Sequence, residues 1–185
     1  MPNGAQGASD AELVIKTIQG NKNAFGDLYQ RYLDPIYRYT YYRVADQSDA
    51  EDLTETIFLK AWNSLQKTNH PPKNVRAWIY RIAHNTIVDH YRTHKPTVPL
   101  AEHESLIETT QSPENIVRSD ERSQLLAEAI QRLDPRLQQV VVCRFVNGLS
   151  HAETAAIMNL SEGHVRVLQH RALRQLRKSL SPEVI

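Results

Sequence analysis

The sequence predicts an all-α protein with two small helical domains joined by a flexible linker, the C-terminal domain containing a helix-turn-helix. Apolar residues recur at helical spacing in both halves, and no segment indicates a strand. Between them, residues 95–113 are polar and proline-containing, and a structureless loop of this length is uncommon inside one compact domain. We expect a disordered tail at 1–9, domains at 10–94 and 114–185, and a linker at 95–113.

Composition narrows the class of protein. The 185 residues include 22 Lys and Arg against 21 Asp and Glu, a net charge of +1, which excludes a uniformly basic coating protein and an acidic disordered chain. The single Cys143 excludes an intramolecular disulfide framework and a cysteine-only metal cage, and it fits a reducing compartment. The apolar runs are too short to span a membrane and the N-terminus lacks a signal-peptide pattern. We expect a cytoplasmic protein without membrane insertion.

Local signals place the helices of the first domain. A short helix is expected over Asp10–Gln19, and apolar spacing predicts a longer one over Asn23–Val44, with a kink or break at Pro35. Ser48 begins a capping-box pattern that opens the next helix. Asn74 can cap the last helix of this domain.

That last helix carries a polar stripe beside its apolar face. At 100° per residue an aromatic ring, an amide and charged groups align, a combination suited to an unstacked base and a nucleic-acid backbone. The stripe is Trp78, Arg81, Asn85, Asp89 and Arg92. A Trp beside an apolar face is more often part of a core than of a ligand site, and an acid three residues before an arginine can form a local ion pair. The stripe by itself does not decide between a nucleic-acid site and these two alternatives, a core tryptophan and a local ion pair.

The second domain shows the strongest local pattern. An amphipathic helix is expected to end near Leu133, and Asp134 then caps a helix with Pro at its first position. That helix should stop at Asn147-Gly148. Ser150 opens a second capping box, and Asn159 stands where a turn needs a positive φ. Ser161 then caps the final helix, so the spacing is that of a helix-turn-helix.

The final helix has two faces of different character. Val165, Leu168, Ala172 and Leu176 form an apolar stripe, and the other side is basic without an acid from 164 to 178. A helix packed by one stripe and basic on the other suits the major groove of DNA, where Arg can read guanine. The alternative is a helical hairpin whose basic face is only solvated.

No group suited to catalysis emerges from the sequence. No His or Cys pair has a metal-ligand spacing with a matching second pair, and no nucleophile has a nearby partner base. We therefore expect no enzyme activity, no metal and no cofactor.

Taken together, three segments resemble bacterial RNA polymerase sigma factors of the extracytoplasmic-function group. They are DAEDLTETIFLKAW at 49–62, NVRAWIYRIAHNTIVDHYR at 74–92, and LDPRLQQVVVCRFVNGLSHAETAAIMNLS followed by EGHVRVLQHRALRQLRK at 133–178. The resemblance covers about Ala24 to Leu180 and leaves out the tail and the linker.

The resemblance implies conserved sigma regions 2 and 4 and three contact surfaces. Core RNA polymerase would contact Asp52, Glu55 and Phe58. The −10 element would meet the stripe on the Asn74–His94 helix, where Asn85 matches a base-contacting position. The −35 element would meet the last helix, at His164, Arg166, Val167, His170, Arg171 and Arg174.

The implied function is a sigma factor that binds core RNA polymerase, directs it to specific promoters and helps melt the −10 element. The implied partners are core RNA polymerase, promoter DNA and an anti-sigma factor. The competing hypotheses are a stand-alone helix-turn-helix regulator that binds an operator as a dimer, and a helical adaptor that binds only proteins.

Overall fold

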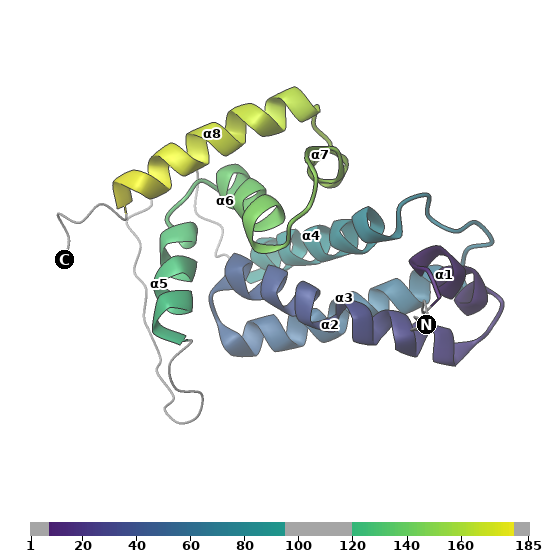
Figure 1. Ribbon diagram of the computed structural model, residues 1–185. Helices are drawn as coiled ribbons and strands as arrows, with labels where there is room; N and C mark the ends of the chain where they lie inside the picture. The colour runs from purple at the N-terminus through teal and green to yellow at the C-terminus, as the bar shows by residue number, and fades with distance from the viewer. Residues whose placement is uncertain (1–7, 95–119, 180–185) are drawn as a thin grey trace, which may run out of the picture.

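The computed structural model describes residues 8–94 and 120–179, and every element in these two ranges is helical (Figure 1). The N-terminal domain holds α1 (Asp10–Ile18), α2 (Lys22–Val44), α3 (Gln47–Gln66) and α4 (Val75–His94). The C-terminal domain holds α5 (Asp120–Gln131), α6 (Pro135–Val141), the π-helical η1 (Val142–Val146), α7 (His151–Met158) and α8 (Glu162–Ser179). The all-α, two-domain prediction is confirmed; the expected linker at 95–113 and tail residues 1–7 lie outside the described residues.

Side-chain caps fix most of the helix starts. Ser9 caps α1 with a full capping box, and the Asn74 side chain accepts the amide hydrogen of Ala77 at 2.8 Å. The prediction that Ser48 opens α3 is wrong. Asp46 is the N-cap, because the chain leaves α2 through a left-handed Ala45 and re-enters a helix at once. The Asp46 carboxylate accepts from the amide of Asp49 at 2.8 Å.

Helix α2 runs without a break through Pro35, contrary to the break that the sequence allows. A proline inside a helix costs about 3 kcal/mol because it removes a backbone donor and clashes with the preceding turn. Tyr32, Ile36 and Tyr39 are buried on both sides of it. Burial of side chains of this size contributes about 1.5–3 kcal/mol each, which offsets that cost.

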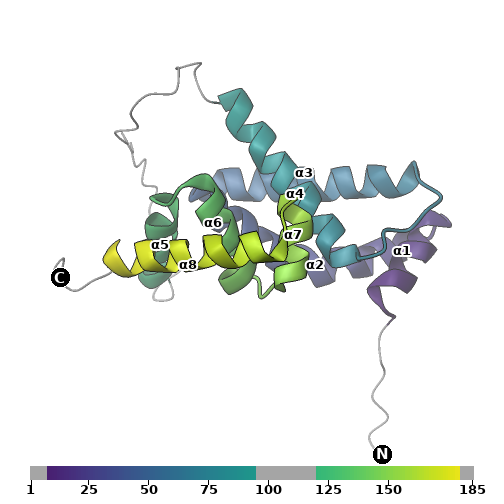
Figure 2. The same cartoon turned by 90° about the horizontal axis from the view of Figure 1, so that it is seen from above.

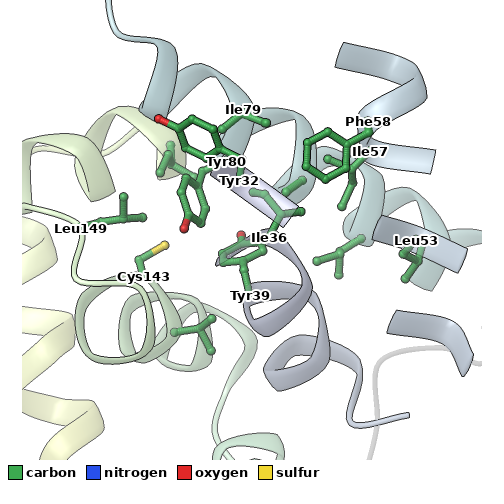
Figure 3. Packing of buried hydrophobic residues seen from close by; sticks show 14 of the residues in the cluster. Tyr32, Ile36, Tyr39, Leu53, Ile57, Phe58, Ile79, Tyr80, Cys143 and Leu149 are labelled. Carbon is green, nitrogen blue, oxygen red and sulfur yellow. The ribbon is translucent and has the colours of Figure 1, made fainter. Parts of the chain in front are cut away.

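Most buried apolar side chains belong to one cluster that includes both domains. Ile57, Ile79 and Leu28 form its N-terminal part. Figure 3 shows Cys143 and Leu149 of the C-terminal domain beside the rings of Tyr39 and Tyr80. A second, smaller cluster of Val140, Ala155, Val165 and Leu168 joins α6, α7 and α8.

The contact between the domains, called the seam below, is rich in directional polar bonds. Arg43 at the end of α2 is only 4% exposed, and its Nη1 donates to Pro135 O at 3.2 Å and Gln138 Oε1 at 2.9 Å. The Gln139 amide donates to the Tyr39 hydroxyl at 2.5 Å. Figure 2 shows α7 lying over α4. Just before α7 in the chain, Asn147 Oδ1 at the end of η1 accepts a hydrogen bond from the Tyr80 hydroxyl of α4 at 3.1 Å.

The seam also leaves a buried polar atom unpaired. Among the described residues, Arg43 Nε is buried without a hydrogen-bond partner. A buried polar atom without a partner costs about 1–3 kcal/mol, and burying the Arg43 charge adds a desolvation cost. The seam therefore combines the shared apolar cluster with a buried charge and an unpaired polar atom that lower its net stability.

His84 makes the closed seam sensitive to pH. Burial, and secondly the Arg43 guanidinium that faces the ring from α2, hold the pKa of His84 below its ordinary value of 6.5. In the closed form, in which the two domains are in contact, His84 therefore binds a proton less readily than in a form that exposes it to water. The free energy that favours the closed form is consequently undiminished above pH 6.5 and falls as the pH drops below that value. We expect the thermal midpoint to fall more between about pH 7.5 and 5.5 in the natural chain than in His84→Gln. Equal falls in the two proteins would contradict this.

Candidate nucleic-acid interface

The turn before α8 has the geometry that the sequence predicts. Asn159 ends α7 with φ 54° and ψ 48°, the left-handed region that Asn tolerates better than most residues. Ser150 caps α7 with a complete capping box. The Ser161 hydroxyl accepts the amide hydrogen of His164 at 3.3 Å, so α8 starts after a short turn. The helix-turn-helix is confirmed.

Helix α8 is divided as its sequence indicates. Val165, Leu168, Ala172 and Leu176 are buried. All six side chains predicted to meet the −35 element are exposed, and five of them line one surface depression: Arg166, Val167, His170, Arg171 and Arg174. The sixth, His164, lies in the first turn, where free backbone N–H groups favour phosphate. Arg166 forms an exposed i,i+4 ion pair with Glu162 at 3.6 Å, which DNA can replace at little cost.

Three polar side chains that sequence reasoning missed hold α8 against the rest of its domain. Gln169 Oε1 lies 3.3 Å from Arg144 Nε and 3.1 Å from His151 Nε2. Arg144 also donates to the carbonyl of Leu149. Because Gln169 looks like an ordinary polar residue beside an apolar stripe, the spacing within α8 carries no signal for it.

Helix α4 has three faces, of which only one is free. One face packs into the N-terminal core through Ile79 and Ile87. A second face meets the C-terminal domain at the seam, where Arg76 Nη2 donates to Asn147 O at 2.7 Å and Nη1 lies 3.8 Å from the Glu153 carboxylate. The third face is the predicted stripe.

The stripe residues are brought together along α4, but not all are equally available. Asn85, Asp89 and Arg92 are exposed, and Asp89 lies 3.9 Å from Lys60 of α3 in an ion pair. Trp78 is half-buried against the apolar core. Arg81 lies at the border of the stripe and the seam and donates to the carbonyl of Ala156 in α7.

A groove of about 480 Å³ runs between α2 and α3, on surfaces distinct from the stripe and from α8. Glu55 and Phe58 both line it, whereas Asp52 is exposed on α3 outside its lining. Phe58 is only 4% exposed, with its ring 4.6 Å from that of Tyr29. Two further lining residues, Tyr29 and Leu59, are not among the predicted polymerase contacts, and Leu59 is 55% exposed.

The described residues offer no other chemistry at these surfaces. Within 8–94 and 120–179, no group of three or more His, Cys, Asp or Glu side chains could hold a metal ion. In the same ranges no helix combines the length and apolarity needed to cross a bilayer. Burial raises the pKa of the Cys143 thiol to about 12, so it is not a reactive thiolate.

Comparison with known proteins decides the family. The family model described as sigma-70 region 2 matches residues 28–97, and that described as sigma-70, region 4 matches residues 129–178. The chain belongs to the sigma-70 family. The first match ends with α4 and the second contains the helix-turn-helix, so each surface described above lies in a sigma region.

Individual relatives place the chain in the extracytoplasmic-function group. It is 39% identical over 91% of its length to ECF RNA polymerase sigma factor BldN of Streptomyces coelicolor, and it spans 65% of that relative's length. It is 29% identical over 90% of its length to ECF RNA polymerase sigma factor SigW of Bacillus subtilis, and covers 94% of it. CnrH, solved with the cytosolic domain of CnrY, shares the fold with a TM-score of 0.74 at 24% identity, covering 92% of this chain and 96% of that one.

Proposed function

We propose that this sigma factor binds core RNA polymerase through the α2–α3 groove, reads the −35 element with α8 and helps melt the −10 element with α4. The observation that carries the proposal is the exposed basic face of α8, which has no acid from 164 to 178, inside a sigma region 4 match. Initiation factors of this family have no catalytic group of their own, and the energy for melting comes from binding.

Reading of the −35 element follows from the groups on α8. Arg166 and Arg171 are both exposed and line the same depression, and a guanidinium can donate two hydrogen bonds to guanine. Val167, 50% exposed, offers a methyl contact to thymine. Arg174, a turn further along, suits a phosphate.

Melting at the −10 element would use the free face of α4. Unstacking a base costs a few kcal/mol, which hydrogen bonds and stacking in a binding site offset. Asn85 offers both a donor and an acceptor to a base edge, and Arg92 lies further along the same exposed face for the backbone. Trp78, being half-buried, can present only part of its ring.

The closed arrangement has to open for both elements to be bound. Positions −10 and −35 are about 25 base pairs apart, which is about 85 Å at roughly 3.4 Å per base pair. In the closed form α7 touches α4 through Arg81 and Arg76, and α8 follows α7 directly. We infer that the domains separate on the polymerase, and residues 95–119 have a contour of up to about 85 Å to permit it.

The alternative of a stand-alone operator-binding regulator explains α8 but not the region 2 match. A net charge of +1 also predicts weak binding of free duplex, since phosphate contacts dominate affinity for DNA. We further propose that the protein acts in the cytoplasm and is controlled by an anti-sigma factor, a class of partner that the solved RpoE of Bartonella quintana binds as NepR.

Run-off transcription with and without purified core polymerase tests the proposal, on promoters selected from a randomised library. The natural chain should start transcripts only with the polymerase. Arg166→Ala with Arg171→Ala should weaken −35-dependent initiation by about 1–3 kcal/mol per lost base contact. Gln175→Ala, also exposed on α8, serves as the control. Tight, sequence-specific binding by the chain alone would favour the operator-binding alternative.

The groove predicts a separable defect in polymerase binding. Leu59→Asp places a charge on the exposed apolar rim, where it cannot disturb the core because the side chain is 55% exposed. Losing one such apolar contact should weaken the affinity for core polymerase by about 1–3 kcal/mol, measured by competition against a labelled natural chain. Asn63→Asp, exposed on the same helix outside the groove lining, is the matched control. Equal affinities for the two variants would place the docking surface elsewhere.

A further inference from the structure

The polar contact centred on Gln169 joins three parts of the C-terminal domain. Its side-chain oxygen meets Arg144 of η1 at 3.3 Å and His151, the first residue of α7, at 3.1 Å. An amide oxygen has two lone pairs, so it can accept from both donors at once. The contact requires His151 to carry a hydrogen on Nε2.

Both donors are themselves fixed by the backbone around them. Arg144 donates through Nη1 to the carbonyl of Leu149, a residue with no exposed surface. His151 stands directly after Ser150, whose capping box fixes the start of α7. Gln169 therefore binds to groups whose positions α7 and η1 determine.

Apolar packing and hydrogen bonds restrain the rotation of α8 about its axis in different ways. Its buried stripe includes Val165 and Ala172, short side chains that set the distance to α6 and α7. Apolar contact is non-directional, whereas hydrogen bonds weaken steeply away from linear geometry. The Gln169 contact thus supplies the directional restraint on α8.

Small rotations of α8 matter to the residues on its exposed face. Side chains extend about 5–6 Å from a helix axis, so a rotation of roughly 15° moves their ends by about 1.5 Å. That displacement is about half the length of a hydrogen bond. Gln169 lies between Leu168 of the buried stripe and His170 of the exposed face, so a change there acts on both.

We propose that Gln169 is a positioning residue that fixes the rotation of α8 and thereby determines which −35 bases the exposed face prefers. The inference rests on the proposed function, since it assigns to α8 the reading of the −35 element. Gln169 itself does not contact DNA in this account; it acts through Arg166, His170 and Arg171.

The test compares base preference with stability. Gln169→Leu keeps the size of the side chain but leaves Arg144 and His151 without their shared acceptor. Gln169→Glu keeps an acceptor oxygen and is the rescue variant, and Gln175→Leu makes the same change at an exposed position of α8. Each is assembled with core polymerase, and initiation is measured on the selected promoter and on all its single-base −35 variants.

Gln169→Leu should reduce discrimination between the selected −35 sequence and its single-base variants by roughly fivefold, while Gln169→Glu and Gln175→Leu keep the natural preferences. A uniform fall on every −35 sequence, or no change, would overturn the proposal. If circular dichroism shows that Gln169→Leu does not fold, His151→Ala is used instead, because it removes one of the two donors to Gln169. His151→Ala should give a smaller loss of discrimination between −35 sequences in the same direction. Unchanged preferences in this variant would count against the proposal. A natural chain that initiates from no promoter would refute the proposed function instead.

Discussion

The seam between the N-terminal and C-terminal domains is the contact that determines where the three candidate surfaces lie relative to one another. It brings Arg76 and Arg81 of α4 onto oxygen acceptors of the C-terminal domain, and it buries Arg43 among carbonyl and amide oxygens. Such bonds need defined geometry, so the seam fixes one relative placement of the two domains. The buried Arg43 Nε, which has no hydrogen-bond partner among the described residues, and the desolvated charge of Arg43 limit how stable that placement is.

This balance has a functional consequence through α4. One helix serves the core, the seam and the predicted −10 surface, and Arg81 lies where the last two meet. If α4 binds DNA as proposed, a phosphate would compete with the carbonyl of Ala156 for the Arg81 guanidinium, and its negative charge makes it the stronger acceptor. Opening of the seam and engagement of DNA by α4 would then be coupled at this guanidinium.

The sequence predicted what local chemistry determines. Asp134, Ser150 and Asn159 act within one turn of a helix, so their roles follow from residue type and spacing. The buried stripe of α8 follows from its period in the same way. The period of α3 alone does not distinguish Ala61, which is fully buried, from Leu59, which is 55% exposed.

What the sequence could not predict depends on groups far apart in the chain. Arg43 and Gln138, 95 residues apart, look like ordinary polar positions until the seam brings them together. The π-helical turn of η1 has no signature in residue type, and it carries Cys143 and Arg144 into contacts with Gln139 and Gln169. The resemblance implies Phe58 as a polymerase contact, and its burial reflects packing against Tyr29 of α2.

An interdomain distance measures whether the two domains separate on the polymerase. Dyes on Lys16→Cys of α1 and Gln175→Cys of α8, both exposed, report it, while Cys143 stays unlabelled because it is fully buried. The free chain should give one short distance, and the complex with core polymerase and promoter DNA should lengthen it by tens of ångströms, toward the ~85 Å between the two elements. A distance that stays short in a transcribing complex would contradict the account.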